Sequence, residues 1–137
     1  MRVVIDTNVL ISAIFWTGKP KQILNKVRRG EITLLTSEFI LEELKKVLRK
    51  ADKPFKLSEE EADRVVTAMR ELAVVVSIGS HVSACQDEND NRVLECAIDG
   101  NADCIITGDF HLLKLGSFQK IGIMTVSDFL DYSKRGS

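Results

Sequence analysis

The sequence predicts an α/β protein, a three-layer α/β/α fold with a central five-stranded parallel sheet, and residues 1–137 are expected to form one domain. Two observations predict this fold. Short, continuous apolar runs alternate with longer segments of helical periodicity, and the composition, 45% hydrophobic and 28% charged, is typical of a globular chain. Strands that are apolar throughout are buried on both faces, which favours a parallel sheet covered by helices.

The expected strands are Val3–Ile5, Ile32–Leu35, Ala73–Val76, Ala102–Ile106 and Ile123–Val126. The expected helices cover residues 8–15, 19–29, 37–50, 58–71, 88–99 and 127–134. Ser58 and Glu61 have the spacing of a capping box, and Ser37 and Ser127 are candidate helix caps. Strands and helices therefore alternate along the whole chain, as a doubly covered parallel sheet requires.

Charge and cysteine content exclude several classes of protein. A formal net charge of −1 argues against a protein that coats nucleic acid non-specifically. Cys85, Cys96 and Cys104 form no CxxC pair, and with His81 and His111 they lack the spacing of a zinc site. We interpret them as reduced, mostly buried residues of a cytoplasmic protein. We expect neither a signal peptide nor a membrane span, since no apolar run reaches about 18 residues.

Two acidic residues directly follow predicted strands. Asp6 ends the run "VVID" at residues 3–6, and Asp109 follows the run "CIITG" at residues 104–108. Ligands of parallel α/β sheets bind outside the carboxyl ends of the strands, which is where both acids are expected. Each alone has a local interpretation, because an aspartate often caps the next helix and Gly108-Asp109 is a common turn sequence.

The predicted helix at 37–50 carries one acid in a special position. Its apolar residues define a single arc, and Glu43 lies on the flank of that arc beside Ile40 and Val47. Glu38 and Glu42 fall nearly opposite and are expected in solvent. Glu43 can therefore lean over the edge of the sheet, or it can be an ordinary boundary residue.

The predicted helix at 88–99 places an acid on its buried face. By the same periodicity Asp90 falls in the middle of that face, whereas Glu88, Glu95 and Asp99 point away from it. An unpaired carboxylate there costs several kcal/mol unless a ligand or a helix N-terminus compensates. Asp90 is thus either a site residue or a cap, and Asp87, one turn earlier, is either an acid that supports the site or a first-turn acid.

Four carboxylates brought together repel one another and stay ionised only beside a cation. Sites made of oxygen ligands suit Mg²⁺ or Mn²⁺. One or two such ions in a carboxylate cluster are typical of phosphodiester hydrolysis, because the metal activates water and stabilises the leaving oxygen. The candidate metal ligands and catalytic residues are Asp6, Glu43, Asp90 and Asp109.

Three segments together resemble the PIN-domain family, in particular the toxin components (VapC-like ribonucleases) of bacterial and archaeal toxin–antitoxin pairs. These segments are "VVIDTNVLISAIFWTGKP", "SEFILEELKKVL" and "DENDNRVLECAIDGNADCIITGDFHLL". In this resemblance Asp6, Glu43, Asp90 and Asp109 match the four family acids in order. Asn8 and Thr107 match polar positions that support the metal site. One departure is Glu88, which stands where many relatives have proline.

The resemblance implies a five-stranded parallel sheet and an endoribonuclease that depends on Mg²⁺ or Mn²⁺. It also implies an RNA substrate, a homodimer and neutralisation by a small antitoxin protein. A basic stretch follows Glu43, whose members are Lys45, Lys46, Arg49, Lys50, Lys53 and Lys56. This stretch could hold an RNA backbone or be a solvated helix end. Phe15 and Trp16 could stack on a base, although core or dimer contacts are the commoner role.

Other functions fit the sequence less well. The main alternative keeps the fold without catalysis, as an inactive PIN-fold module that binds RNA or protein. A receiver domain would need paired acids after the first strand, but Thr7 follows Asp6. A dinucleotide-binding domain would need a GxGxxG motif after the first strand, and none is present.

Overall fold

The computed structural model describes residues 1–50 and 52–135 of the chain. Its strands are β1 (Arg2–Ile5), β2 (Thr33–Thr36), β3 (Val74–Val75), β4 (Cys104–Ile106), β5 (Ser117–Phe118) and β6 (Ile121–Met124). Its helices are α1 (Thr7–Phe15), α2 (Lys19–Arg28), α3 (Glu38–Leu48), α4 (Glu59–Leu72), α5 (Glu88–Asp99), α6 (Phe110–Leu113) and α7 (Val126–Arg135). All five predicted strands and all six predicted helices are present, with bounds shifted by a few residues at most.

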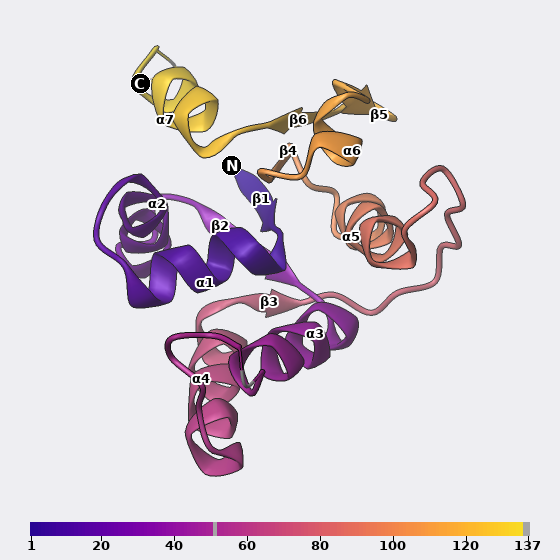
Figure 1. Ribbon diagram of the computed structural model, residues 1–137. Helices are drawn as coiled ribbons and strands as arrows, with labels where there is room; N and C mark the ends of the chain where they lie inside the picture. The colour runs from indigo at the N-terminus through magenta and orange to yellow at the C-terminus, as the bar shows by residue number, and fades with distance from the viewer. Residues whose placement is uncertain (51, 136–137) are drawn as a thin grey trace.

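The strands form one sheet in the order β3-β2-β1-β4-β6-β5. Every neighbouring pair is parallel except β5 with β6. Figure 1 shows α1, α2 and α7 on one side of the strands and α5 on the other, with α3 and α4 beside β3. The α/β class with a parallel sheet between helices is therefore confirmed. The sheet is larger than predicted, since the two-residue antiparallel strand β5 is added at its edge.

The central strands carry the core, as their uninterrupted apolar sequences predict. Val3, Val4 and Ile5 of β1 are at most 1% exposed, and Ile105 and Ile106 of β4 are completely buried. α5 packs directly on β1 and β2 from its side of the sheet. β1 lies in the middle of the sheet, so the residue that follows it is held at the centre of the edge formed by the strands' carboxyl ends.

Helix caps confirm two sequence predictions and correct a third. Ser37 caps α3 by accepting the N–H of Ile40, and Ser58 with Glu61 forms the predicted capping box at α4. Ser127 is not a cap, because α7 already begins at Val126. Thr125 takes that role, and its hydroxyl accepts the N–H of Asp128 at 3.1 Å. Ser127 is two residues beyond the cap and inside the first turn, where its hydroxyl cannot reach the first free amides.

The three cysteines are free thiols, as predicted, with Cys96 and Cys104 buried and Cys85 half-buried. Within the residues that the structure describes, no helix is both long enough and apolar enough to cross a bilayer.

Candidate active site

The four predicted acids line a single pocket at the carboxyl ends of β1 and β4. The pocket encloses about 120 Å³, and Asp6, Glu43, Asp90 and Asp109 all contribute to its wall. Its other lining residues are Thr7, Asn8, Phe39, Ile40, Asp87, Asn89 and Val93. Five carboxylates and no lysine or arginine line the pocket, so its surface is strongly acidic.

Asp6 is fixed by the backbone on both sides. Its N–H donates to the carbonyl of Ile106 at 3.1 Å, which holds the end of β1 against β4. Its Oδ1 accepts the N–H of Val9 at 3.1 Å and so caps α1. Burial raises the pKa of this carboxyl, and the hydrogen bonds from Thr107 and Val9 oppose the rise. The N-cap interpretation of Asp6 and its place in the acidic pocket are both correct.

Thr107 connects Asp6 to Asp109. The completely buried Thr107 hydroxyl donates to Asp6 Oδ2 and accepts the backbone N–H of Asp109 at 2.9 Å. Asp109 in turn caps α6, since its Oδ1 accepts the N–H of His111 at 2.7 Å. One hydroxyl therefore sets the spacing between two of the candidate acids.

Asp90 lies where helical periodicity placed it, on the buried face of α5, and is only 5% exposed. Its Oδ2 is buried, and among the described residues no donor bonds to it. Burial and the neighbouring Asp109 carboxylate together raise the pKa of Asp90 to about 7. The alternative of a cap is excluded, because Asp87 caps α5 by accepting the N–H of Asn89 at 2.9 Å.

Glu43 reaches the pocket from α3, on the flank of the helix's buried arc. It is half-buried, whereas its neighbour Glu42 is exposed. No hydrogen bond or ion pair holds the Glu43 side chain within residues 1–50 and 52–135. The carboxylate therefore remains available to a ligand in the pocket.

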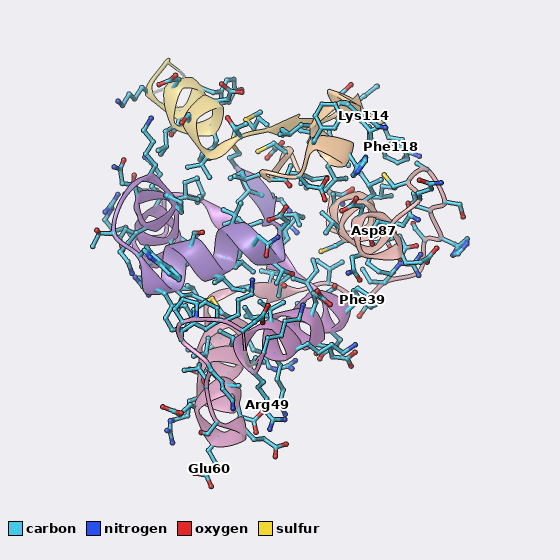
Figure 2. The ribbon with its side chains drawn as sticks, viewed as in Figure 1. Phe39, Arg49, Glu60, Asp87, Lys114 and Phe118 are labelled. Carbon is cyan, nitrogen blue, oxygen red and sulfur yellow. The ribbon has the colours of Figure 1, made fainter. Side chains whose placement is uncertain are left out.

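Two polar or aromatic pocket residues, Phe39 and Asn89, escaped sequence analysis. Phe39 lies one helical turn before Glu43, and Figure 2 shows it at the start of α3, with Asp87 at the start of α5. Asn89 also lines the pocket, from the first turn of α5. The i, i+4 spacing of Phe39 and Glu43 was a usable signal, since such residues share one helix face.

One sequence prediction about α5 is wrong. Glu95 was expected to point away from the protein, yet it is 3% exposed. The loop before α5 folds over it, and its Oε2 accepts the N–H of Val82 at 2.9 Å. Arg92 pairs with Glu95 at 3.0 Å and with Glu88 at 3.2 Å. Arg92 is therefore engaged outside the acidic pocket.

The chemistry of the pocket fits a divalent cation, although its carboxylates are not closed around one point. In the described part of the chain, no three acidic, histidine or cysteine side chains are close enough together to enclose an ion. The donors are nevertheless all oxygens, which suits Mg²⁺ or Mn²⁺. The buried, unpartnered Oδ2 of Asp90 is an oxygen that such an ion would satisfy.

Comparison with known proteins agrees with this geometry. The family model described as "PIN domain" matches residues 2–111. An uncharacterized protein of Methanocaldococcus jannaschii, MJ1680, is 34% identical over 117 residues, which cover 84% of this chain and 75% of that protein.

Two solved structures share the fold. VapBC2 of Rickettsia felis, bound to a DNA fragment from its promoter, has a TM-score of 0.64 at 16% identity, covering 91% of this chain and 98% of the other. VapBC-1 of nontypeable Haemophilus influenzae has a TM-score of 0.63 at 17% identity, covering 93% and 99%. The family match spans β1 and β4, which are followed by Asp6 and Asp109. It also spans α3 and α5, which carry Glu43 and Asp90. The chain belongs to the PIN-domain family, whose members are generally nucleases.

Proposed function

We propose that this protein is a metal-dependent endoribonuclease that hydrolyses RNA phosphodiester bonds, and that it acts as the toxin of a toxin–antitoxin pair. One observation carries the nuclease proposal. Four acids from four separate elements line one pocket, and one of them, Asp90, has a buried oxygen without a donor. A carboxylate in that position destabilises the protein unless a ligand compensates.

Asp6, Glu43, Asp90 and Asp109 would hold Mg²⁺ or Mn²⁺ in this proposal. The bound ion supplies positive charge that activates a water and stabilises the leaving oxygen of a phosphodiester. The chain's own residues position the ligands. Thr107 holds Oδ2 of Asp6 through its hydroxyl and fixes the backbone of Asp109, and the cap bonds hold Oδ1 of Asp6 and Oδ1 of Asp109.

The toxin assignment is supported by similarity of fold. The two structures compared above are of VapBC proteins, and the chain covers nearly all of the matched chains. A VapC-like toxin would bind an antitoxin protein and would associate as a homodimer. These partners are part of the proposal and are tested separately from catalysis, by co-purification with the product of the adjacent gene.

The catalytic test uses labelled single-stranded RNA with Mn²⁺, with Mg²⁺ and with a chelator. The variants are Asp90→Asn, Glu43→Gln and the matched control Glu42→Gln. Glu42 and Glu43 are neighbours on α3, but only Glu43 lines the pocket. We expect cleavage that needs metal, falls at least about a hundredfold in Asp90→Asn and Glu43→Gln, and is unchanged in Glu42→Gln.

A second function has one observation in its favour, which is that no three metal-binding side chains converge in the described residues. That arrangement would suit an inactive PIN-fold module that binds RNA or protein. Calorimetry with Mn²⁺ separates the two functions. Absence of Mn²⁺ binding together with absence of cleavage would favour the inactive module, and cleavage that survives chelator would exclude a metal-dependent site.

A further inference from the structure

A second, larger cavity lies beside the acidic pocket, between α1, α3 and residues 53–55. It encloses about 420 Å³ and is lined by Asn8, Ile11, Ser12, Trp16, Val47, Lys53, Pro54 and Phe55. Asn8 also lines the acidic pocket. The two cavities are therefore neighbours that share one wall residue, and a single extended ligand can occupy both.

Two aromatic rings, those of Trp16 and Phe55, line this cavity, and Phe15 packs against both of them. Phe15 and Phe55 stack with centroids 4.6 Å apart and an interplanar angle of 2°. The indole of Trp16 meets both rings edge-on, at 6.0 Å from Phe15 and 5.8 Å from Phe55. Trp16 nevertheless remains 48% exposed. The stacked pair holds the indole in place while leaving part of it open, which is a preorganised stacking surface.

The surface of α1 connects the rings to the acids. Asn8, Ser12 and Trp16 follow one another at intervals of four residues, so they lie along one face of the helix. Asn8 is at the end next to the acidic pocket and Trp16 is the C-cap of α1. Eight residues of helix span about 12 Å, which places Trp16 beyond a nucleotide bound at the acids.

Cations are concentrated in the sequence around Lys53, which lines the cavity. Arg49, Lys50 and Lys56 are exposed nearby in sequence, with Asp52 as an acid among them. Within residues 1–50 and 52–135, no ion pair engages any of these four cations. Lys45, from the same basic stretch, differs because it pairs with Asp63 at 2.8 Å and with Glu59 at 3.6 Å. The unpaired cations suit a phosphate backbone.

We propose that this cavity is a nucleobase-binding subsite, in which a base flanking the cleaved bond stacks on Trp16 while Lys53 faces the neighbouring phosphate. The proposal rests on the proposed ribonuclease function and adds a residue that selects where single-stranded RNA is cut. An aromatic stack flanked by unpaired cations is the combination that single-stranded nucleic acid binds. Base-paired RNA would not offer an unstacked base to the indole.

Binding can be tested without cleavage, because Trp16 is the single tryptophan of the sequence. The Asp90→Asn protein is titrated in chelator with single-stranded RNA, and indole emission is followed. We expect quenching by RNA, and weaker quenching by RNA that carries an abasic site at the flanking position. Unchanged emission at RNA concentrations that saturate binding would overturn the proposal.

Cleavage by the active protein gives the second test. Trp16→Ala should lower kcat/KM on single-stranded RNA by about five- to a hundredfold, and Trp16→Phe should retain most of the activity. An abasic site at the flanking position should lower the kcat/KM of the wild type by a similar factor. It should hardly change the kcat/KM of Trp16→Ala, since the abasic site and the substitution remove the same stacking contact. The matched control is Tyr132→Ala on α7, an aromatic residue of similar exposure, 51%, that does not line this cavity.

The outcomes separate this proposal from the one it rests on. A wild type that does not cleave RNA contradicts the ribonuclease function, and the emission titration then still tests the subsite. A wild type that cleaves, with Trp16→Ala equally active, overturns the subsite alone. If Trp16→Ala leaves cleavage intact but changes the molar mass by light scattering, Trp16 belongs to an interface between copies of the chain, which also overturns the subsite.

Discussion

The four acids of the candidate site form two pairs that the fold treats differently. Asp6 and Asp109 follow strands, and each has an oxygen that accepts a backbone N–H and caps a helix. Glu43 and Asp90 lie within helices, and in the described residues neither carboxylate accepts a hydrogen bond from a backbone amide. All four reach the same pocket.

This difference separates acids that folding can use from acids that it cannot. Capping aspartates stabilise their helices, so Asp6 and Asp109 would have a structural reason to be present without any ligand. Asp90 lies in the first turn of α5, which favours a carboxylate, but burial disfavours its charged form and no donor among the described residues reaches its Oδ2. The two acids within helices, Glu43 and Asp90, are therefore the stronger indication of a bound cation. Variants of these two acids should behave differently from variants of Asp6 and Asp109.

The largest expected effect concerns Asp90 and pH. Its pKa is about 7 in the folded protein against 3.8 as the ordinary value, so between these pH values the folded state binds the extra proton. The contribution of Asp90 to stability is therefore most favourable below about pH 4, and it falls as the pH rises from 4 to 7. In chelator, raising the pH from 4 to 8 should cost the wild type up to about 4 kcal/mol more than Asp90→Asn.

Urea unfolding at several pH values measures this difference, with Mn²⁺ added in a parallel series. Mn²⁺ should restore stability to the wild type at pH 8 and leave Asp90→Asn nearly unchanged. Stability curves of the two proteins that run parallel from pH 4 to 8 would show that Asp90 is not strained in the fold. The contrast between the two pairs of acids would then lose its basis.

The next effect compares one acid from each pair by alanine substitution. Asp6→Ala removes the cap of α1 and leaves the buried Thr107 hydroxyl without its acceptor, so it should cost about 2 kcal/mol. Glu43→Ala removes no hydrogen bond, and alanine suits a helix interior, so it should change stability by less than about 0.5 kcal/mol. Both variants should lose cleavage.

Thermal and urea unfolding in chelator compare the two variants directly, and a cleavage assay accompanies them. Loss of activity without loss of stability in Glu43→Ala is the signature of a residue that serves only a ligand. Equal destabilisation by the two substitutions would mean that Glu43 makes contacts within the fold that its geometry does not show.

Sequence patterns predicted the site better than its surroundings. The apolar residues of α3 and α5 fix the rotation of each helix, and that rotation alone placed Glu43 and Asp90 toward the sheet. The same reasoning failed for Glu95, because a helical wheel recognises one buried face and the loop before α5 covers a second. That loop has no regular periodicity, so its path over Glu95 could not be anticipated.

Short elements were beyond prediction for a related reason. The four residues of α6 and the two of β5 contain too little sequence to show any period. The local alternative for Asp109 was consequently a turn, whereas the residue caps α6. Its place in the site followed from its position after a strand, and that part of the inference needed no knowledge of the helix.

The smallest effect tests whether the Thr107 hydroxyl holds Asp6 and Asp109 in position, and the chain contains a matched control. Thr107 and Thr36 are both buried threonines at the carboxyl ends of strands that neighbour β1. Thr107 bonds to Asp6 and Asp109, whereas the Thr36 hydroxyl has no partner. Replacing each by valine keeps the shape of the side chain. Thr107→Val should therefore cost about 1 kcal/mol of stability, and Thr36→Val should be neutral or stabilising.

Thr107→Val should also slow cleavage, since Asp6 and Asp109, two of the proposed metal ligands, lose the hydroxyl to which both are bonded. If the two valine variants have equal stability and equal cleavage rates, the Thr107 hydroxyl contributes to neither. The helix-capping bonds alone must then hold Asp6 and Asp109 in position.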